Sequence, residues 1–377
     1  MARNDVVLLT GFPSLVARAV CAEVLASDAD ARVVAVVRGK FAGDAAAARD
    51  EFPPDQRTRL RFLEGDAASI DLGLSGVEFK GLVREVTRIH HCAQVTYLGV
   101  DRKTAERLNV DGAAEILELA SHCDDLEALV FHSTTHVSGD RRGIVYEEDL
   151  AAGQAFRTVV EETKARAERM MRTAMDRLPI VVVRPATIVG DSRTGEVDRF
   201  DGPYLGVLLV VTSPPDLALP LPGRGDQPLN LVPIDWVARA AVALGRDPSA
   251  RGGTFHLVDP NPLPARRVFE LVARAGGRRG PRGSIPANLA KALLRAPGLE
   301  RIAKSPRAFL ETLTTAVTYD ARHADERLSA LDVPRCPPLE SYIEKLVEFV
   351  QERVRQRRAV RAQLDADAEA EVEDPLG

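Results

Sequence analysis

The sequence predicts an α/β fold in which a parallel sheet is covered by helices on both faces. Short apolar runs, too short for helices, alternate along the chain with longer amphipathic stretches. The runs are rich in Val, Leu and Ile, as is typical of strands that are buried on both faces. Strands that alternate with helices of this length indicate a doubly wound parallel sheet.

Each element follows from its own pattern. Thr104 to His122 and Arg157 to Arg177 carry apolar residues at helical spacing, as does the stretch after Leu15. Ile89 opens an apolar run behind a short helix that contains Leu82. The remaining predicted strands are β-branched or leucine-rich runs over 6–9, 33–37, 60–63, 129–131 and 180–183.

Composition narrows the functional classes. The 377 residues carry a net charge of −5 and a pI near 5.9, which gives no electrostatic footprint for nucleic acid. No stretch approaches the roughly 20 apolar residues of a membrane span, and the first strand begins too early for a signal peptide. The four cysteines lie far apart without metal-type spacing. We therefore expect a cytoplasmic protein without a metal site.

The turn after the first strand is the candidate cofactor site. It reads Thr10-Gly11-Phe12-Pro13-Ser14-Leu15 and lies between a strand end and a helix start. Free N–H groups and the positive dipole end of a helix favour a phosphate at such a place. Compared with the fingerprint T-G-x-x-G-x-x-G, Ser14 replaces the second glycine and Ala17 the third. An ordinary strand–turn–helix is the alternative interpretation.

The end of the second predicted strand distinguishes between two cofactors. An acidic residue there binds the ribose 2′-hydroxyl of NAD, whereas arginine suits the 2′-phosphate of NADP. This chain has Arg38 with Lys40 close behind and no preceding carboxylate. The charges favour NADP over NAD, and a solvated basic loop is the alternative.

Several short motifs follow one another at distances that match one family. They are Gly65-Asp66, Leu72-Gly73-Leu74-Ser75, His91-Cys92-Ala93-Gln94, Asn109-Val110-Asp111-Gly112, Ser133-Thr134, Arg184-Pro185 and the run from Val189 to Glu196. Together they resemble the extended short-chain dehydrogenase/reductase family with its Rossmann-type fold. The branch of thioester reductases and fatty acyl-CoA reductases is the most similar one. The resemblance covers about residues 5–260.

The resemblance implies roles for individual residues. Asp66 would contact the adenine, Ala93 would lie along the cofactor ribose, and Pro185 to Ile188 would hold the carboxamide end. Thr134 would donate a hydrogen bond to the substrate carbonyl oxygen. Lys164 would bind the nicotinamide ribose and lower the pKa of a proton donor. For each residue the alternative is a structural role as a loop polar group or a helix cap.

One member of the family's catalytic set is missing. The tyrosine that the family has four residues before Lys164 is Val160 here, which has no proton to give. General acid catalysis contributes about 10² to 10⁴ in rate, so the usual chemistry is in question. If the strand continued past Thr134, His136 would share its face and offer a substitute acid. Tyr97 and Tyr146 are further candidates.

The chain divides into a Rossmann domain and a smaller, mainly helical C-terminal substrate lobe. Residues 1–200, with 230–260 returning, are expected to form the NAD(P)-binding domain. Residues 201–229 and 261–360 are expected to form the lobe, in which Leu205, Leu208 and Leu209 line an acyl pocket by resemblance or pack in its core. The acidic stretch 361–377 is predicted to be disordered.

Three functions remain open at this level. The first is an NADP-dependent reductase of an acyl thioester or related carbonyl. The second is a catalytically impaired NAD(P)-binding homologue that acts as a sensor or partner. The third is epimerase or dehydratase chemistry on a sugar nucleotide, which would also normally require the missing tyrosine. The resemblance also implies a homodimer.

Overall fold

Seven parallel strands form the central sheet, in the spatial order β11-β7-β5-β4-β1-β2-β3. The computed structural model describes residues 5–97, 99–200, 203–285 and 316–373. The strands of the sheet are β1 (Val6–Thr10), β2 (Arg32–Val37), β3 (Leu60–Glu64), β4 (Arg88–His91), β5 (Ala128–His132), β7 (Ile180–Pro185) and β11 (Thr254–Leu257). This confirms the predicted Rossmann-type doubly wound fold.

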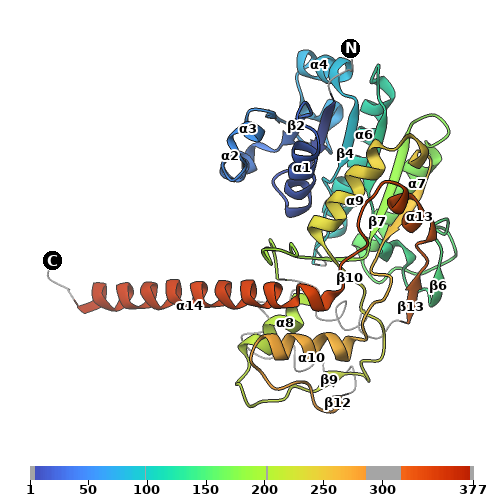
Figure 1. Cartoon of the computed structure of the whole chain (residues 1–377). Helices are drawn as coiled ribbons and strands as arrows, with labels where there is room; N and C mark the ends of the chain where they lie inside the picture. The colour runs from blue at the N-terminus through green and yellow to red at the C-terminus, as the bar shows by residue number, and fades with distance from the viewer. Residues whose placement is uncertain (1–4, 98, 201–202, 286–315, 374–377) are drawn as a thin grey trace.

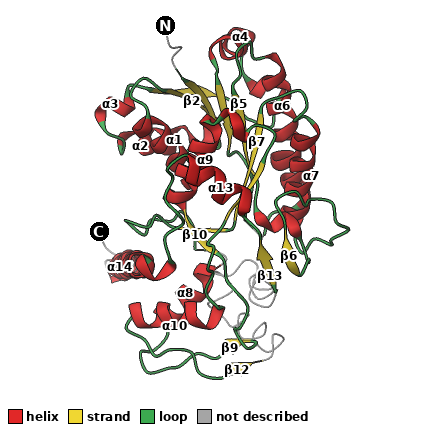
Figure 2. Cartoon of the chain, turned by 45° about the vertical axis from the view of Figure 1, so that its right-hand side comes forward, coloured by secondary structure: helices red, strands yellow, loops and turns green. Residues whose placement is uncertain are grey.

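Helices cover both faces of the sheet (Figures 1 and 2). Successive strand residues point to opposite faces, so Val7 and Leu9 pack on one side of β1 and Leu8 on the other. The first face is covered by α1 (Leu15–Ser27), α2 (Ala42–Asp50), α9 (Ile234–Arg246) and α13 (Arg322–Ala330). The second is covered by α4 (Gly76–Glu85), α6 (Gly112–His122) and α7 (Val159–Thr173).

Two predicted helices differ in their bounds. The expected helix over 104–122 consists of α5 (Arg102–Ala105), a wider turn (Glu106–Asp111) and α6. The expected helix over 157–177 begins at Val159, because the Thr158 side chain accepts the N–H of Glu161 and caps the first turn. The short helix α3 (Pro54–Arg57) precedes β3.

The strand order places a switch point between β1 and β4. From β1 the chain runs outward to β2 and β3, then returns to β4 on the other side of β1. Ligands of open parallel sheets bind at the carboxyl ends of the strands beside such a point. The turn after β1 and the loop after β4 therefore face one another at the expected position.

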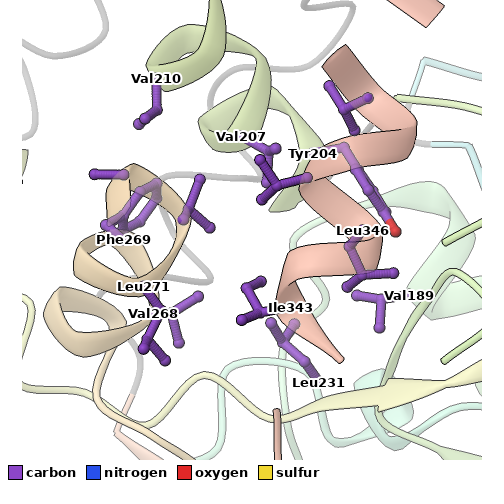
Figure 3. Packing of buried hydrophobic residues seen from close by; sticks show 14 of the residues in the cluster. Val189, Tyr204, Val207, Val210, Leu231, Val268, Phe269, Leu271, Ile343 and Leu346 are labelled. Carbon is purple, nitrogen blue, oxygen red and sulfur yellow. The ribbon is translucent and has the colours of Figure 1, made fainter. Parts of the chain in front are cut away.

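A second group of helices forms the smaller lobe. Helices α8 (Pro203–Thr212) and α10 (Ala265–Ala275) pack with the start of α14 (Ile343–Glu373) around one apolar core, shown in Figure 3. Val189 and Leu231 join this core from β8 (Thr187–Val189) and β10 (Leu231–Pro233). The remaining strands are β6 (Gly143–Val145), β9 (Leu221–Pro222), β12 (Ser284–Ile285) and β13 (Val317–Tyr319).

The chain crosses between the two parts more often than the sequence predicts. Within the range 261–360 assigned to the lobe, Tyr319, Ala324 and Leu328 pack against α9 and the sheet. Helix α14 leaves the body and projects outward in Figure 1. The helix continues through Glu373, so residues 361–373 are helical where the sequence predicts a disordered tail. The stretch is helical because it is rich in Ala and Glu, which are strong helix formers. No helix of the described part is long and apolar enough to cross a membrane.

Candidate functional site

The turn between β1 and α1 is shaped by Gly11. Its φ of +88° lies in the left-handed region, and a Cβ would come within 2.6 Å of the Cys92 carbonyl carbon. The turn closes with the Ser14 N–H donating to the Gly11 carbonyl at 3.0 Å, across Phe12 and Pro13. Gly11 thus lets the turn lie directly against the loop that follows β4.

Ser14 serves helix α1 itself. Its hydroxyl oxygen accepts the N–H of Ala17 at 3.4 Å and caps the helix. The next free N–H, that of Leu15, donates to a carboxylate oxygen of Asp198 at 2.5 Å. Arg18, one turn into α1, pairs with Asp198 at 2.9 Å and with Glu196 at 2.8 Å. The motif ending at Glu196 was recognised in the sequence, but its contact with Arg18 was not predicted, because 180 positions separate Arg18 from Asp198.

The two cations at the end of β2 are available to a ligand. Arg38 is half-buried and Lys40 exposed, and each lies 4.9 Å from the centre of the Phe41 ring. Neither forms an ion pair with a residue that the structure describes. Asp66, by contrast, is already engaged, since its carboxylate accepts the Ala68 N–H and pairs with Arg107, both at 3.1 Å.

The loop after β4 is tied to the sheet and to α7. Thr10 Oγ1 lies 3.0 Å from Nδ1 of His91 and accepts the Ala93 N–H at 3.1 Å. Asn109 accepts the Val95 N–H at 2.8 Å and donates to the Thr163 hydroxyl at 2.9 Å. These bonds fix the wall opposite Gly11. Among the described residues, the side-chain amide of Gln94, next to Ala93, has a buried nitrogen and a buried oxygen without hydrogen-bond partners. The sequence motif did not reveal this feature.

Thr134 and His136 come together through a turn. Strand β5 ends at His132, and a 3₁₀ turn (Thr135–Ser138) follows, so the two residues do not share a strand face as predicted. Instead the His136 backbone N–H donates to Thr134 Oγ1 at 3.3 Å. That N–H occupies one lone pair of Thr134 Oγ1, so the hydroxyl proton is directed away from it. The hydroxyl donates within the protein to the Pro185 carbonyl, at a long distance of 3.5 Å.

The His136 ring is a poor acid at neutral pH. Burial, with smaller effects of Arg157 and Lys164, lowers the pKa of His136 to about 4. The imidazole is therefore neutral at pH 7, and its Nε2 lies 3.3 Å from Thr187 Oγ1 in β8, next to Ile188.

Each of the two tyrosines that could replace the missing proton donor lies against an arginine. Tyr146 follows β6, is 40% exposed and stacks with Arg322 at 5.9 Å. Tyr97 lies under the Arg199 guanidinium at 5.8 Å.

Lys164 is the most unusual group of the candidate site at the carboxyl ends of the strands. It lies on α7, one turn after Val160, and the two residues are 5% and 7% exposed. Burial lowers the pKa of Lys164 to about 8, although Cys92 and Glu168 favour its charged form. Its ammonium donates no hydrogen bond to any residue within the described ranges. It remains charged at pH 7 and has donors to spare for a ligand.

A buried ion pair connects the helix of Lys164 to the strand of Thr134. Arg184 in β7 bonds through Nε to both oxygens of Glu168 at 3.0 Å, and Glu168 accepts the Ser133 hydroxyl proton at 2.5 Å. Arg184 and Glu168 are 1% and 0% exposed. Ser133 adjoins Thr134 in sequence, so this network connects β7 and α7 to the end of β5 next to Thr134.

The apolar core of the lobe is nearly filled. Leu205 and Leu208 are buried in it and Leu209 is half-buried. A cavity of about 20 Å³ remains between α8, α10 and α14, lined by residues such as Tyr204, Phe269 and Leu346 (Figure 3). That space holds about one water molecule, so this core is no open acyl channel. The leucines take the core-packing role that the sequence left open.

Comparison with known proteins identifies the family. A model of the NAD-binding family described as male sterility protein matches residues 9–241, which is more than half of the chain. The chain is 26% identical over 222 residues to fatty acyl-CoA reductase wat of Drosophila melanogaster, and the match covers 52% of this chain and 42% of the reductase. It is 27% identical over 223 residues to glycine betaine reductase ATRR of Emericella nidulans, covering 58% and 17%. The chain thus spans less than half of either relative.

A solved structure has a similar fold. The terminal R domain of the myxalamid PKS-NRPS biosynthetic pathway superposes with a TM-score of 0.77 at 22% identity, over 94% of this chain and 92% of that one. The chain belongs to the male sterility protein family, in the thioester reductase and fatty acyl-CoA reductase-like branch of the extended short-chain dehydrogenase/reductases that its motifs predict.

Proposed function

We propose that this chain is an NADP-dependent oxidoreductase that reduces an acyl thioester or a related carbonyl. The observation that carries the proposal is Lys164, a residue only 5% exposed whose ammonium donates no hydrogen bond within the described chain, on helix α7, which packs against the turn after Thr134. Strongly perturbed ionisable groups in a crevice are typical of functional sites. The names of the relatives, which include a fatty acyl-CoA reductase, support the reaction class.

A dinucleotide needs partners at three places of the candidate site, and the residues present suit it at two of them. Arg38 and Lys40 supply unpaired positive charge for a 2′-phosphate, which is why we propose NADP over NAD. Lys164 offers donors for the nicotinamide ribose. The third point, the start of α1, is held by Asp198. The dinucleotide therefore fits once that carboxylate has moved.

The chain's own residues have separate tasks in the reaction. The bound cofactor would supply a hydride. Thr134 would donate a hydrogen bond from its hydroxyl to the substrate carbonyl oxygen, and the His136 N–H would hold that hydroxyl in orientation. Lys164 would add positive charge to the crevice. Val160 gives no proton, so the site suits a leaving group that departs as a stable anion, and a thiolate is such a group.

A catalytically impaired homologue is the second candidate. Two observations favour it: Val160 lies buried in place of the family's proton donor, and Asp198 covers the helix end that a cofactor phosphate would need. In this alternative the chain would bind a dinucleotide, or a partner, without turnover.

Binding and turnover experiments separate the two. We expect NADPH to bind in a fluorescence titration more tightly than NADH, and Arg38→Glu to remove the preference. Turnover on a panel of acyl thioesters, lost in Thr134→Ala, would establish the reductase. Val160→Tyr should raise turnover by about 10²-fold or more if the rest of the site is assembled. Tight NADPH binding without turnover in either the wild type or Val160→Tyr would favour the impaired homologue.

A further inference from the structure

The segment between β8 and α8 begins with a closed turn. The Asp191 side chain accepts the N–H groups of Arg193 at 2.8 Å and Thr194 at 3.0 Å. The Gly195 N–H donates to the Asp191 carbonyl at 2.8 Å, and the Asp191 N–H donates to the Glu196 carbonyl at 3.1 Å. This is the local structure of the family motif from Gly190 to Glu196, and it sets the position of the residues that follow.

The turn is held by two helices. Ser192 donates through its backbone N–H and its hydroxyl to the Asp235 carboxylate at the start of α9, at 2.9 and 2.7 Å. Gly195 lies so close to α14 that a Cβ would come within 2.1 Å of the Lys345 carbonyl oxygen. Because the turn is fixed on both sides, Glu196 and Asp198 approach α1 from a defined direction.

The two carboxylates meet the start of α1 as a phosphate would. Asp198 accepts the Leu15 N–H at 2.5 Å, and Arg18 donates to Asp198 and to Glu196 at 2.9 and 2.8 Å. A negative charge at a helix N-terminus is stabilised by free N–H groups and by the helix dipole. The Asp198 side chain is 38% exposed, so water and an incoming anion reach it.

We propose that Asp198 is a displaceable latch that occupies the diphosphate position of the cofactor. The inference rests on the proposed function, since it assumes that a dinucleotide binds in this crevice. Two anions cannot share one helix N-terminus, so the diphosphate and Asp198 exclude one another. Dinucleotide binding then releases residues 196–200, which lead toward α8 and the substrate lobe.

The latch has a measurable consequence for affinity. While Asp198 is bound, only a fraction of the molecules is competent, and the apparent Kd for the cofactor rises by the inverse of that fraction. A charge-assisted hydrogen bond of this kind corresponds to about a tenfold effect on an equilibrium. Asp198→Asn should therefore bind NADPH about tenfold more tightly than the wild type does.

The experiment compares NADPH titrations of the wild type, Asp198→Asn and a matched control, Asp216→Asn. Asp216 is an acid of the lobe whose side chain is 88% exposed and pairs only with Arg279 among the described residues. We expect tighter binding in Asp198→Asn and unchanged binding in Asp216→Asn. Hydrogen exchange of residues 191–200 gives a second readout: NADPH should speed it in the wild type, and in Asp198→Asn it should be fast without NADPH.

The outcomes separate the latch from the proposed function. NADPH binding that is equal or weaker in Asp198→Asn, with no NADPH-dependent exchange in the wild type, overturns the latch and leaves the reductase proposal standing. The absence of NADPH and NADH binding in all three proteins at millimolar concentration overturns both. Equal tightening in Asp198→Asn and Asp216→Asn shows a general effect of net charge and also overturns the latch.

Discussion

Replacing Arg184 with methionine should destabilise the chain strongly. The guanidinium is 1% exposed and donates to Glu168, to the Glu147 carbonyl at 3.2 Å and to the Asp149 carbonyl at 2.7 Å. Methionine fills a similar volume but has no donor, so Glu168 keeps the Ser133 hydroxyl and loses its buried counter-charge. Breaking a buried ion pair by removing one partner costs about 3–5 kcal/mol. Arg172, which is 26% exposed, still lies 3.7 Å from Glu168 and compensates its charge in part, so the loss should fall toward the lower end of that range.

Urea unfolding at pH 7 measures the loss, followed by the fluorescence of Trp236, the single tryptophan, which lies in α9 over the sheet. Arg102→Met is the control, since Arg102 pairs with Glu162 at 2.9 Å but is 54% exposed. Surface pairs contribute about 0–1 kcal/mol. A free energy of unfolding that falls no further for Arg184→Met than for Arg102→Met would refute the assigned role of the buried network.

Three further predictions concern single groups. Gly11→Ala should lower the free energy of unfolding by about 2 kcal/mol or more, because φ is positive there and the new Cβ clashes with Cys92. Its control is Gly43→Ala, where the new Cβ meets no neighbouring atom within 4 Å and should stabilise the helix by up to about 1 kcal/mol. Equal effects of the two variants in urea unfolding would contradict this. Lys164→Met should raise the free energy of unfolding at pH 7 by about 1–3 kcal/mol, since burial lowers the pKa of Lys164 in the folded protein to about 8 from 10.5. This gain should fade as the pH rises from 8 to 10.5, because the lysine is then neutral in the folded protein. A gain independent of pH would speak against a buried charge. The His136 ring should show no NMR titration between pH 5.5 and 8, and a midpoint near 6.5 would contradict its burial.

Local patterns predicted the sheet because its strands are buried on both faces. Val33 to Val37 and Ile180 to Val183 leave no periodicity for a surface helix, and each belongs to a strand that is paired on both sides, one place in from an edge of the observed sheet. The position of Thr134 followed from the same logic, since it comes two residues after the end of β5. The roles of Thr134 and Lys164 stay predictions until ligand binding is measured.

The relations that sequence reasoning missed depend on long-range geometry. Thr134 and His136 approach one another because β5 ends at His132, and a strand end is set by the neighbouring strands. Asp198 reaches Leu15 from 183 positions away, and no local spacing encodes that contact. Motif comparison identified Ser14 as a degraded glycine position; only the fold reveals that an acid from another loop lies in front of it.

The cost of burying Lys164 is the strongest physical argument for a ligand that contacts this residue. Burial disfavours its ammonium, and within the described residues no hydrogen bond compensates for it. The Arg184–Glu168 pair next to it is also desolvated, although apolar residues of similar volume would often stabilise a core equally well. A fold that served only as a scaffold would gain nothing from either feature over a well-packed apolar core. Ribose hydroxyls would satisfy the free donors of Lys164, so NADPH should stabilise the wild type against unfolding more than it stabilises Lys164→Met. Equal stabilisation of the two proteins would show that the ammonium does not face the cofactor, and the argument for a reductase site would then lose its main support.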